Sequence, residues 1–167
     1  MAIVPNSVTI DEYLATSYSP DREYVDGTIL ERNMGKGRHA FVQLQVGIRL
    51  TEQTRSLSRV VTVEHRTRVS PERVRIPDVC VVEQLEEVTT QPPLLCVEIL
   101  SPDDHWKRVL AAISDYHLMG VPYVWVVDPY SIRAWTFELD QPPREVLDGK
   151  LTAPAFGLEL TLTDILP

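Results

Sequence analysis

Residues 94–128 read LLCVEILSPDDHWKRVLAAISDYHLMGVPYVWVVD, and this stretch decides the expected fold. The runs at 94–100 and 122–128 are short, apolar and rich in β-branched residues, as in strands covered on both faces. The residues between them predict a helix over 103–119. A strand–helix–strand unit places its two strands parallel in one sheet. The stretch therefore predicts an α/β domain with a parallel pair at the centre of its sheet.

The ends of this unit are also marked in the sequence. Asp103 or Asp104 is expected to cap the helix at its start, because short acidic side chains accept hydrogen bonds from free helical N–H groups. Gly120 is expected to end the helix in a left-handed conformation. Residues 132–138 are expected to pair with the strand before them as a hairpin that turns through 129–131.

Upstream residues predict further helices and strands of the same domain. Their patterns predict a helix, a hairpin, a helix and two strands, at residues 9–18, 22–32, 38–56, 59–70 and 76–83. The hairpin turn is placed at Asp26-Gly27, a dipeptide typical of tight β-turns. The strand at 59–70 would carry Glu64, Arg66 and Arg68 on one polar face. Downstream, a short strand is expected at 144–147 and a helical turn near 161–166.

Length and composition predict one globular domain. The chain has 167 residues and a mass of 19.0 kDa, and 44% of the residues are hydrophobic and 24% charged. These values are close to those of folded soluble domains, which usually hold roughly 100–200 residues. No run reaches the ~18 apolar residues of a membrane span. The N-terminus lacks the basic start of an export signal, so a cytoplasmic protein without a membrane partner is expected.

The two cysteines predict buried thiols. Cys80 and Cys96 each lie inside an apolar run, which is typical of packed thiols in a reducing compartment. The spacing of cysteines and histidines matches no zinc site, so no zinc is expected.

The net charge of −8 is unevenly distributed along the chain. Residues 1–31 carry a net charge of −5, residues 32–75 a net charge of +7 with ten bases, and residues 76–167 a net charge of −10. The overall charge argues against a protein that coats nucleic acid indiscriminately. The basic segment is either a solvated helix and hairpin or a surface that faces phosphates.

Two carboxylates stand out because they lie in strands that are otherwise apolar. Asp78 opens the run PDVCVV, and Glu98 lies within LLCVEIL. A carboxylate in a central strand is costly to bury unless it is paired or binds a metal. Two of them on consecutive strands fit a magnesium or manganese site, because these ions prefer oxygen ligands. A buried arginine partner or a strand cap is the structural alternative.

Two further residues are weaker candidates for the same cleft. His39 begins the predicted helix at 38–56, where it is either a local hydrogen-bonding residue or a catalytic one. The preceding loop, GKGR, lacks the spacing and the Ser/Thr of a P-loop. Glu23 precedes the Asp26-Gly27 turn and is a candidate to face the same cleft, although the alternation of side chains along the strand does not decide this.

These segments together resemble the Uma-type putative restriction endonuclease family. The resemblance covers about residues 20–130 and rests, in order, on REYVDGTILE, GKGRHAFVQLQVGIRL, RIPDVCVV, PPLLCVEILSPDD and DYHLMGVPYVWVVDP. It implies membership of the PD-(D/E)XK nuclease superfamily, with a restriction-endonuclease-like mixed β-sheet core flanked by helices. It implies a single domain over 1–167, with an N-terminal helix and hairpin at 1–32, a core at 33–138 and an extension at 139–167.

The resemblance also assigns roles to individual residues. Asp78 and Glu98 correspond to the superfamily's metal-binding acids, which implies Mg or Mn as cofactor and DNA as substrate. Glu23 corresponds to the glutamate of the family's hairpin, and His39 to a histidine common at the start of the long helix. Gln43 or Gln45, about one turn later, is expected to face the cleft.

The lysine of the superfamily pattern is absent at both of its usual places. One place is two residues after Glu98, where this chain has Leu100. The other lies four residues before the helix tyrosine, where it has Ala112. That lysine normally orients water and stabilises charge on the phosphate. Lys107 or Arg108, on the same helix, is therefore the expected replacement.

Three hypotheses follow from these residues. The first is a divalent-metal-dependent endonuclease that hydrolyses DNA and acts as a homodimer, as nucleases of this fold often do. The second is a catalytically degenerate protein of nuclease fold that binds nucleic acid or a protein partner without cleavage. The third is purely structural, with both carboxylates neutralised by arginines such as Arg66 or Arg68 and with no cleft.

Overall fold

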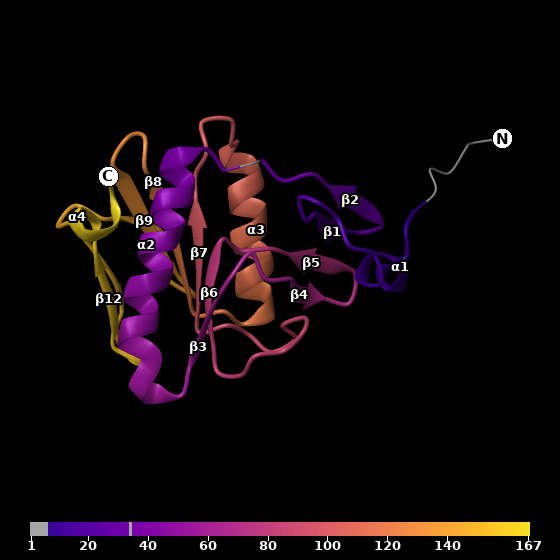
Figure 1. Cartoon of the computed structure of the whole chain (residues 1–167), viewed down its shortest axis with the longest axis horizontal. Helices are drawn as coiled ribbons and strands as arrows, with labels where there is room; N and C mark the ends of the chain where they lie inside the picture. The colour runs from indigo at the N-terminus through magenta and orange to yellow at the C-terminus, as the bar shows by residue number, and fades with distance from the viewer. Residues whose placement is uncertain (1–6, 34) are drawn as a thin grey trace.

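A computed structural model describes residues 7–33 and 35–167 of the chain (Figure 1). Within them the strands form a six-stranded, a four-stranded and a two-stranded sheet. Residues 1–6 and Met34 lie outside the described residues. The first range belongs to the N-terminus for which no export signal was expected, and Met34 belongs to the expected loop before the long helix.

The six-stranded sheet is the centre of the fold. In spatial order its strands are β10 (Arg144–Glu145), β9 (Arg133–Glu138), β8 (Tyr123–Asp128), β7 (Leu95–Ile99), β6 (Val79–Val82) and β3 (Val60–Val63). β7 and β8 pair in parallel, and the other neighbours pair antiparallel. The predicted mixed sheet with a parallel central pair is therefore confirmed, and so is the hairpin formed by β8 and β9.

Two long helices, α2 (Gly37–Thr54) and α3 (Trp106–Met119), cover opposite faces of this sheet (Figure 1). Buried valines of α2 pack with the side chains of Val79 and Val97, whereas buried residues of α3 pack with Cys80 and Cys96. Alternate residues of each strand therefore serve different helices, as the two-residue period of a strand requires. Both cysteines are fully buried free thiols, as expected.

The four-stranded sheet lies beside the core and joins two distant parts of the chain (Figure 1). Its spatial order is β2 (Thr28–Leu30), β1 (Glu23–Val25), β5 (Arg73–Arg75) and β4 (Thr67–Ser70). Asp26 and Gly27 both have positive φ, 49° and 85°, so the predicted turn is confirmed. The preceding helix α1 (Ile10–Leu14) begins at a capping box formed by Thr9 and Glu12.

The predicted single strand at 59–70 is wrong. The chain turns at Glu64, whose φ of 47° lies in the left-handed region, and this turn divides the segment into β3 and β4. The two strands belong to different sheets. Glu64, Arg66 and Arg68 therefore do not share one face of a strand.

The predicted start of α3 is also wrong. His105 takes the N-cap position, without a side-chain cap, and Asp104 instead accepts a hydrogen bond from the Ser101 N–H at 2.7 Å. The Asp104 carboxylate therefore stabilises the turn before the helix instead of capping the helix. Gly120 ends α3 at φ 104°, as expected.

The C-terminal segment contains a hairpin that the sequence patterns did not predict. It consists of β11 (Lys150–Ala153) and β12 (Leu158–Thr161), with the 3-10 turn Pro154–Phe156 between them. Buried leucines of both strands, and of the following helix α4 (Leu162–Ile165), join the core on the α2 face. A second 3-10 turn, Arg55–Leu57, follows α2. None of the helices in the described ranges combines the length and apolar character that a membrane crossing needs.

Candidate active site

Asp78 lies immediately before β6 and is almost fully buried. Its Oδ1 accepts a hydrogen bond from Arg32 Nη2 at 3.0 Å. Its Oδ2 accepts the Ile99 N–H at 2.7 Å and lies 3.2 Å from His39 Nε2. The carboxylate is therefore bound by a main-chain group of the neighbouring strand and by two side chains from the segment before and at the start of α2.

His39 is held against Asp78 in a largely buried position. Burial by itself would lower its pKa, but the hydrogen bond to Asp78 and the negative charge there outweigh burial and raise the pKa. A protonated imidazole donates to the aspartate from Nε2 and balances part of its charge. His39 is thus positioned as a partner of Asp78.

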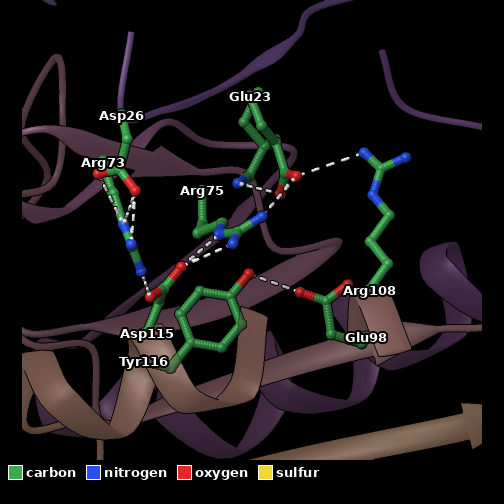
Figure 2. Close-up of polar contacts among 9 residues, drawn as sticks. Glu23, Asp26, Arg73, Arg75, Glu98, Arg108, Asp115 and Tyr116 are labelled. Carbon is green, nitrogen blue, oxygen red and sulfur yellow. Dashed lines mark hydrogen bonds and ion pairs between the residues drawn. The ribbon is translucent and has the colours of Figure 1, made fainter. Parts of the chain in front are cut away.

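Glu98 lies in β7 on the side that faces α3. Tyr116 Oη donates a hydrogen bond to Glu98 Oε1 at 2.5 Å (Figure 2). Burial raises the pKa of Glu98 well above the usual glutamate value, and the neighbouring charge of Asp78 raises it further. The two carboxylates are therefore close enough to repel each other, which favours a cation between them.

Glu23, the first residue of β1, reaches the same place from the four-stranded sheet. Figure 2 shows its carboxylate bound by Arg75 from one side and by Arg108 from the other. The nitrogen–oxygen distances are 3.0 and 3.3 Å. Arg75 also pairs with Asp115 of α3 at 2.7 Å. A buried ion network therefore joins the small sheet to the helix that covers the core.

A cleft with a volume of about 60 Å³ lies between these groups. Its lining includes five of the six predicted site residues, namely Glu23, His39, Asp78, Glu98 and Arg108. Lys107 is exposed and is not part of the lining. Leu100 and Ala112, the two positions where the superfamily lysine was expected, do line the cleft and make that part of its wall apolar.

The predicted glutamines are placed differently from each other. Gln43 Nε2 donates to the main-chain carbonyl of Asp78 at 3.0 Å, which helps to fix the start of β6. Gln45 does not line the cleft. Gln43 does not line the cleft either and borders a separate groove between α2 and β3, so its contact with the site is the hydrogen bond to the Asp78 carbonyl.

Comparisons with known proteins identify the family and the fold of this chain. The family model Uma2, described as "Putative restriction endonuclease", matches residues 10–163. The chain belongs to the Uma2 family. The resemblance that the sequence motifs indicated is therefore confirmed. A search of curated proteins found no match.

A solved structure related to this Uma2 family member supports the fold. It is described as a putative nuclease belonging to DUF820 from Anabaena variabilis ATCC 29413. The two chains superpose with a TM-score of 0.84 at 22% sequence identity, over 95% of this chain and 97% of the other. The predicted restriction-endonuclease-like fold is confirmed.

Arg32 is a charged residue of the cleft that the sequence patterns did not indicate. It follows β2 in a segment without regular structure, and its side chain is only 15% exposed. Burial alone would lower its pKa, but the charges of Asp78 and Glu98 outweigh burial and raise it. The basic segment at 32–75 contains Arg32, but no local pattern distinguishes it from the other nine bases.

The arginines named in the purely structural hypothesis lie elsewhere. Arg66 pairs with Asp21 at 2.6 Å, and Arg68 donates to the Pro71 carbonyl. Asp78 is paired, but with Arg32, and among the described residues Glu98 has no ion-pair partner. The purely structural hypothesis is therefore wrong in its proposed pairings, and the cleft that it excluded is present.

The basic segment of this Uma2 family member does not form a free basic surface. Six of its ten bases have carboxylate partners: Arg32, Lys36, Arg49, Arg66, Arg73 and Arg75. For the other four, no carboxylate partner is found among the described residues, and three of them, Arg38, Arg59 and Arg68, donate to carbonyl oxygens. Most of the positive charge of this segment is therefore already paired with groups of the same chain.

The cleft has oxygen donors suited to a divalent cation. Asp78 immediately precedes β6 and Glu98 lies in the neighbouring strand β7. A magnesium site often uses one or two carboxylates with water and phosphate as the remaining ligands. Within residues 7–33 and 35–167, no three acidic, histidine or cysteine side chains are grouped closely enough to hold an ion by themselves. The donor set therefore fits a metal site with two carboxylate ligands, Asp78 and Glu98. In this site Asp78 already accepts hydrogen bonds from Arg32 and the Ile99 N–H.

Proposed function

We propose that this protein is a divalent-metal-dependent endonuclease that hydrolyses phosphodiester bonds of DNA. The observation that carries the proposal is the convergence of Asp78, just before β6, and Glu98, in β7, on one cleft. The cleft also contains Glu23, His39 and Arg108. A nuclease-family match over most of the chain supports the reaction class. Carboxylate pairs and phosphate substrates share the same preferred cations, Mg²⁺ and Mn²⁺.

Each residue has a separate role in this proposal. Asp78 and Glu98 hold the cation, which when bound would lower the pKa of water and offset charge on the phosphate. The Ile99 N–H and His39 fix the orientation of the Asp78 carboxylate. Tyr116 fixes one oxygen of Glu98 in the same way.

Arg108 replaces the missing lysine in this proposal. Its guanidinium lines the cleft, whereas Lys107 points its charge elsewhere on the exposed side of the helix. Arginine donates in a planar fork that matches phosphate oxygens. Its present partner is Glu23, so phosphate would compete with Glu23 for Arg108.

A nicking assay on supercoiled plasmid DNA with Mn²⁺ or Mg²⁺ tests the proposal. The native protein is expected to cut the plasmid, and Asp78→Asn and Glu98→Gln are expected to lose cleavage. The cleavage rate of Arg108→Gln is expected to be lower than the native rate by about 10²-fold or more. Glu145→Gln is the matched control, because Glu145 is an acid outside the cleft, paired with Arg133. Equal cutting by native protein and Asp78→Asn would refute the assignment. An RNA of the same sequence tests the choice of DNA.

A second candidate function is supported by two specific observations. Leu100 and Ala112 give the cleft apolar walls where a lysine is expected, and most bases of the 32–75 segment are already paired. The apolar walls favour a catalytically degenerate protein that binds nucleic acid or a protein partner, and the paired bases favour the protein partner. Under this hypothesis Asp78→Asn retains binding in a filter or gel-shift assay and no variant cuts.

We also propose a homodimer, because nucleases of this fold commonly use two sites for two strands. Light scattering after size-exclusion chromatography is expected to give twice the 19.0 kDa mass of the chain. A single species of 19.0 kDa at assay concentration would contradict the dimer.

A further inference from the structure

The Arg32 guanidinium occupies the electrostatic position that a cation would fill. Its Nη2 binds Asp78 Oδ1 at 3.0 Å, and it lies close enough to Glu98 and Glu23 for their charges to act on it. An arginine that pairs with one carboxylate of a candidate metal site competes with the metal for that carboxylate. The contacts of Arg32 therefore bear directly on how the cleft takes up an ion.

Arg32 also has a second carboxylate within reach. Its Nη1 lies 4.0 Å from Glu64 Oε1, so the one guanidinium lies between Asp78 in the cleft and Glu64 outside it. The Glu64 side chain is 53% exposed, whereas that of Asp78 is 6% exposed. Arg32 itself lies in a segment that is neither helix nor strand, so ladder hydrogen bonds do not hold its backbone. Glu64 is therefore the nearest second carboxylate partner for an arginine that leaves Asp78.

We propose that Arg32 is a built-in counter-cation of the Asp78–Glu98 cleft, and that a divalent cation enters by displacing it from Asp78 toward Glu64. The inference rests on the proposed function, since it concerns the same cleft. Its physical basis is charge balance, because the carboxylates need one cationic partner and repel each other without it. The arginine keeps the metal-free cleft folded, and the same contact weakens metal binding.

Calorimetric titration of Mn²⁺ into the metal-free protein tests this exchange. Arg32→Gln is expected to bind Mn²⁺ roughly tenfold more tightly than the native protein, because no charged hydrogen bond to Asp78 has to be broken. In thermal unfolding without metal, Arg32→Gln is expected to have a lower Tm than the native protein. Saturating Mn²⁺ is expected to raise the Tm of Arg32→Gln by more than it raises the native Tm.

Two matched variants separate displacement from a general effect of charge. Arg108→Gln removes the same charge from the same cleft but leaves Asp78 paired, and is expected to change Mn²⁺ affinity far less than Arg32→Gln. Glu64→Gln removes the second position of Arg32 and is expected to weaken binding by about two- to fivefold. Glu31→Gln, an exposed acid paired with Arg22, is the control for loss of one negative charge.

The outcomes distinguish this inference from the proposed function. Tighter binding by Arg32→Gln, with Arg108→Gln near native, supports the exchange. Equal gains in Mn²⁺ affinity in both arginine variants, or no gain in Arg32→Gln, overturn the exchange. Either result is still compatible with a metal site that depends on Asp78. No Mn²⁺ binding by any variant overturns both the exchange and the metal-dependent function. If Arg32→Gln does not fold, the Mn²⁺ affinity of Glu64→Gln tests the exchange. Weaker binding than that of Glu31→Gln supports the exchange, and equal binding overturns it.

Discussion

The Tyr116 hydroxyl donates a 2.5 Å hydrogen bond to the Glu98 carboxylate and so connects α3 to the central strand β7. Burial raises the pKa of the phenol well above its usual value, so Tyr116 remains a donor. The same bond opposes the effect of burial on Glu98 by favouring its charged form. This contact therefore supports both the packing of the helix and the ionisation of a proposed metal ligand.

Removing this hydroxyl is expected to weaken the fold and the cleft together. Tyr116→Phe should lower the free energy of unfolding by about 1–2 kcal/mol, because the buried acceptor on Glu98 loses its partner. It should also raise the pKa of Glu98 further and weaken Mn²⁺ binding at a fixed pH. Urea denaturation and calorimetry measure the two effects. Tyr130→Phe, at an exposed tyrosine, is the control. Unchanged stability and affinity would mean that the bond contributes nothing.

The raised pKa of Glu98 gives stability a defined pH dependence. A carboxyl whose folded pKa is raised stabilises the fold below its unfolded value of 4.5, and that contribution is lost as pH rises toward the folded pKa. The metal-free native protein should therefore lose stability relative to Glu98→Gln above pH 4.5, by on the order of 1 kcal/mol per pH unit. Denaturation curves of both proteins in a chelator measure the difference. Parallel pH profiles would contradict the raised pKa.

Arg75 is expected to be more important for stability than exposed arginines. It is 4% exposed and pairs with Glu23 and Asp115, so Arg75→Leu leaves two buried acids with fewer partners (Figure 2). The expected loss in the free energy of unfolding is about 3 kcal/mol. Arg133→Leu, which breaks the exposed pair with Glu145, should cost much less. Similar losses in the two variants would show that burial of the Arg75 network is unimportant.

The two thiols are expected to be unreactive in the folded protein. Cys80 and Cys96 are register partners on β6 and β7, both fully buried, and burial raises the pKa of Cys96. A thiol reagent attacks the thiolate, so both groups should react slowly until the protein is unfolded. Ellman's reagent with and without denaturant measures this. Rapid native labelling of either thiol would reveal an opening of the sheet beside Asp78.

The elements predicted correctly from sequence are those specified by local chemistry. The Asp26-Gly27 turn needs positive φ at both residues, and this residue pair accepts it. The parallel pair follows from two apolar runs that flank a helix. By contrast, the left-handed Glu64 has no local signal, so the division between β3 and β4 was missed. The hairpin of β11 and β12 was missed because its strands are short and Pro154 and Gly157 interrupt the pattern.

The candidate site was predictable only in part for a similar reason. Asp78 and Glu98 are conspicuous because they are charged residues in apolar strands. Arg32 is an ordinary residue after a hairpin, and its partner Asp78 lies 46 positions away. Tertiary packing alone brings them together. Choosing between Lys107 and Arg108 also required the structure, since adjacent residues of a helix face different sides.

The pairing of six of the ten bases at 32–75 has a consequence for any encounter with a polyanion. A base that neutralises a phosphate releases condensed counterions, which contributes a slope of about −0.9 to log K against log salt concentration. The remaining four bases of this segment would contribute a slope of about −4 at most. If the proposed DNA substrate is correct, this segment is therefore expected to add only a moderate dependence on ionic strength to its binding.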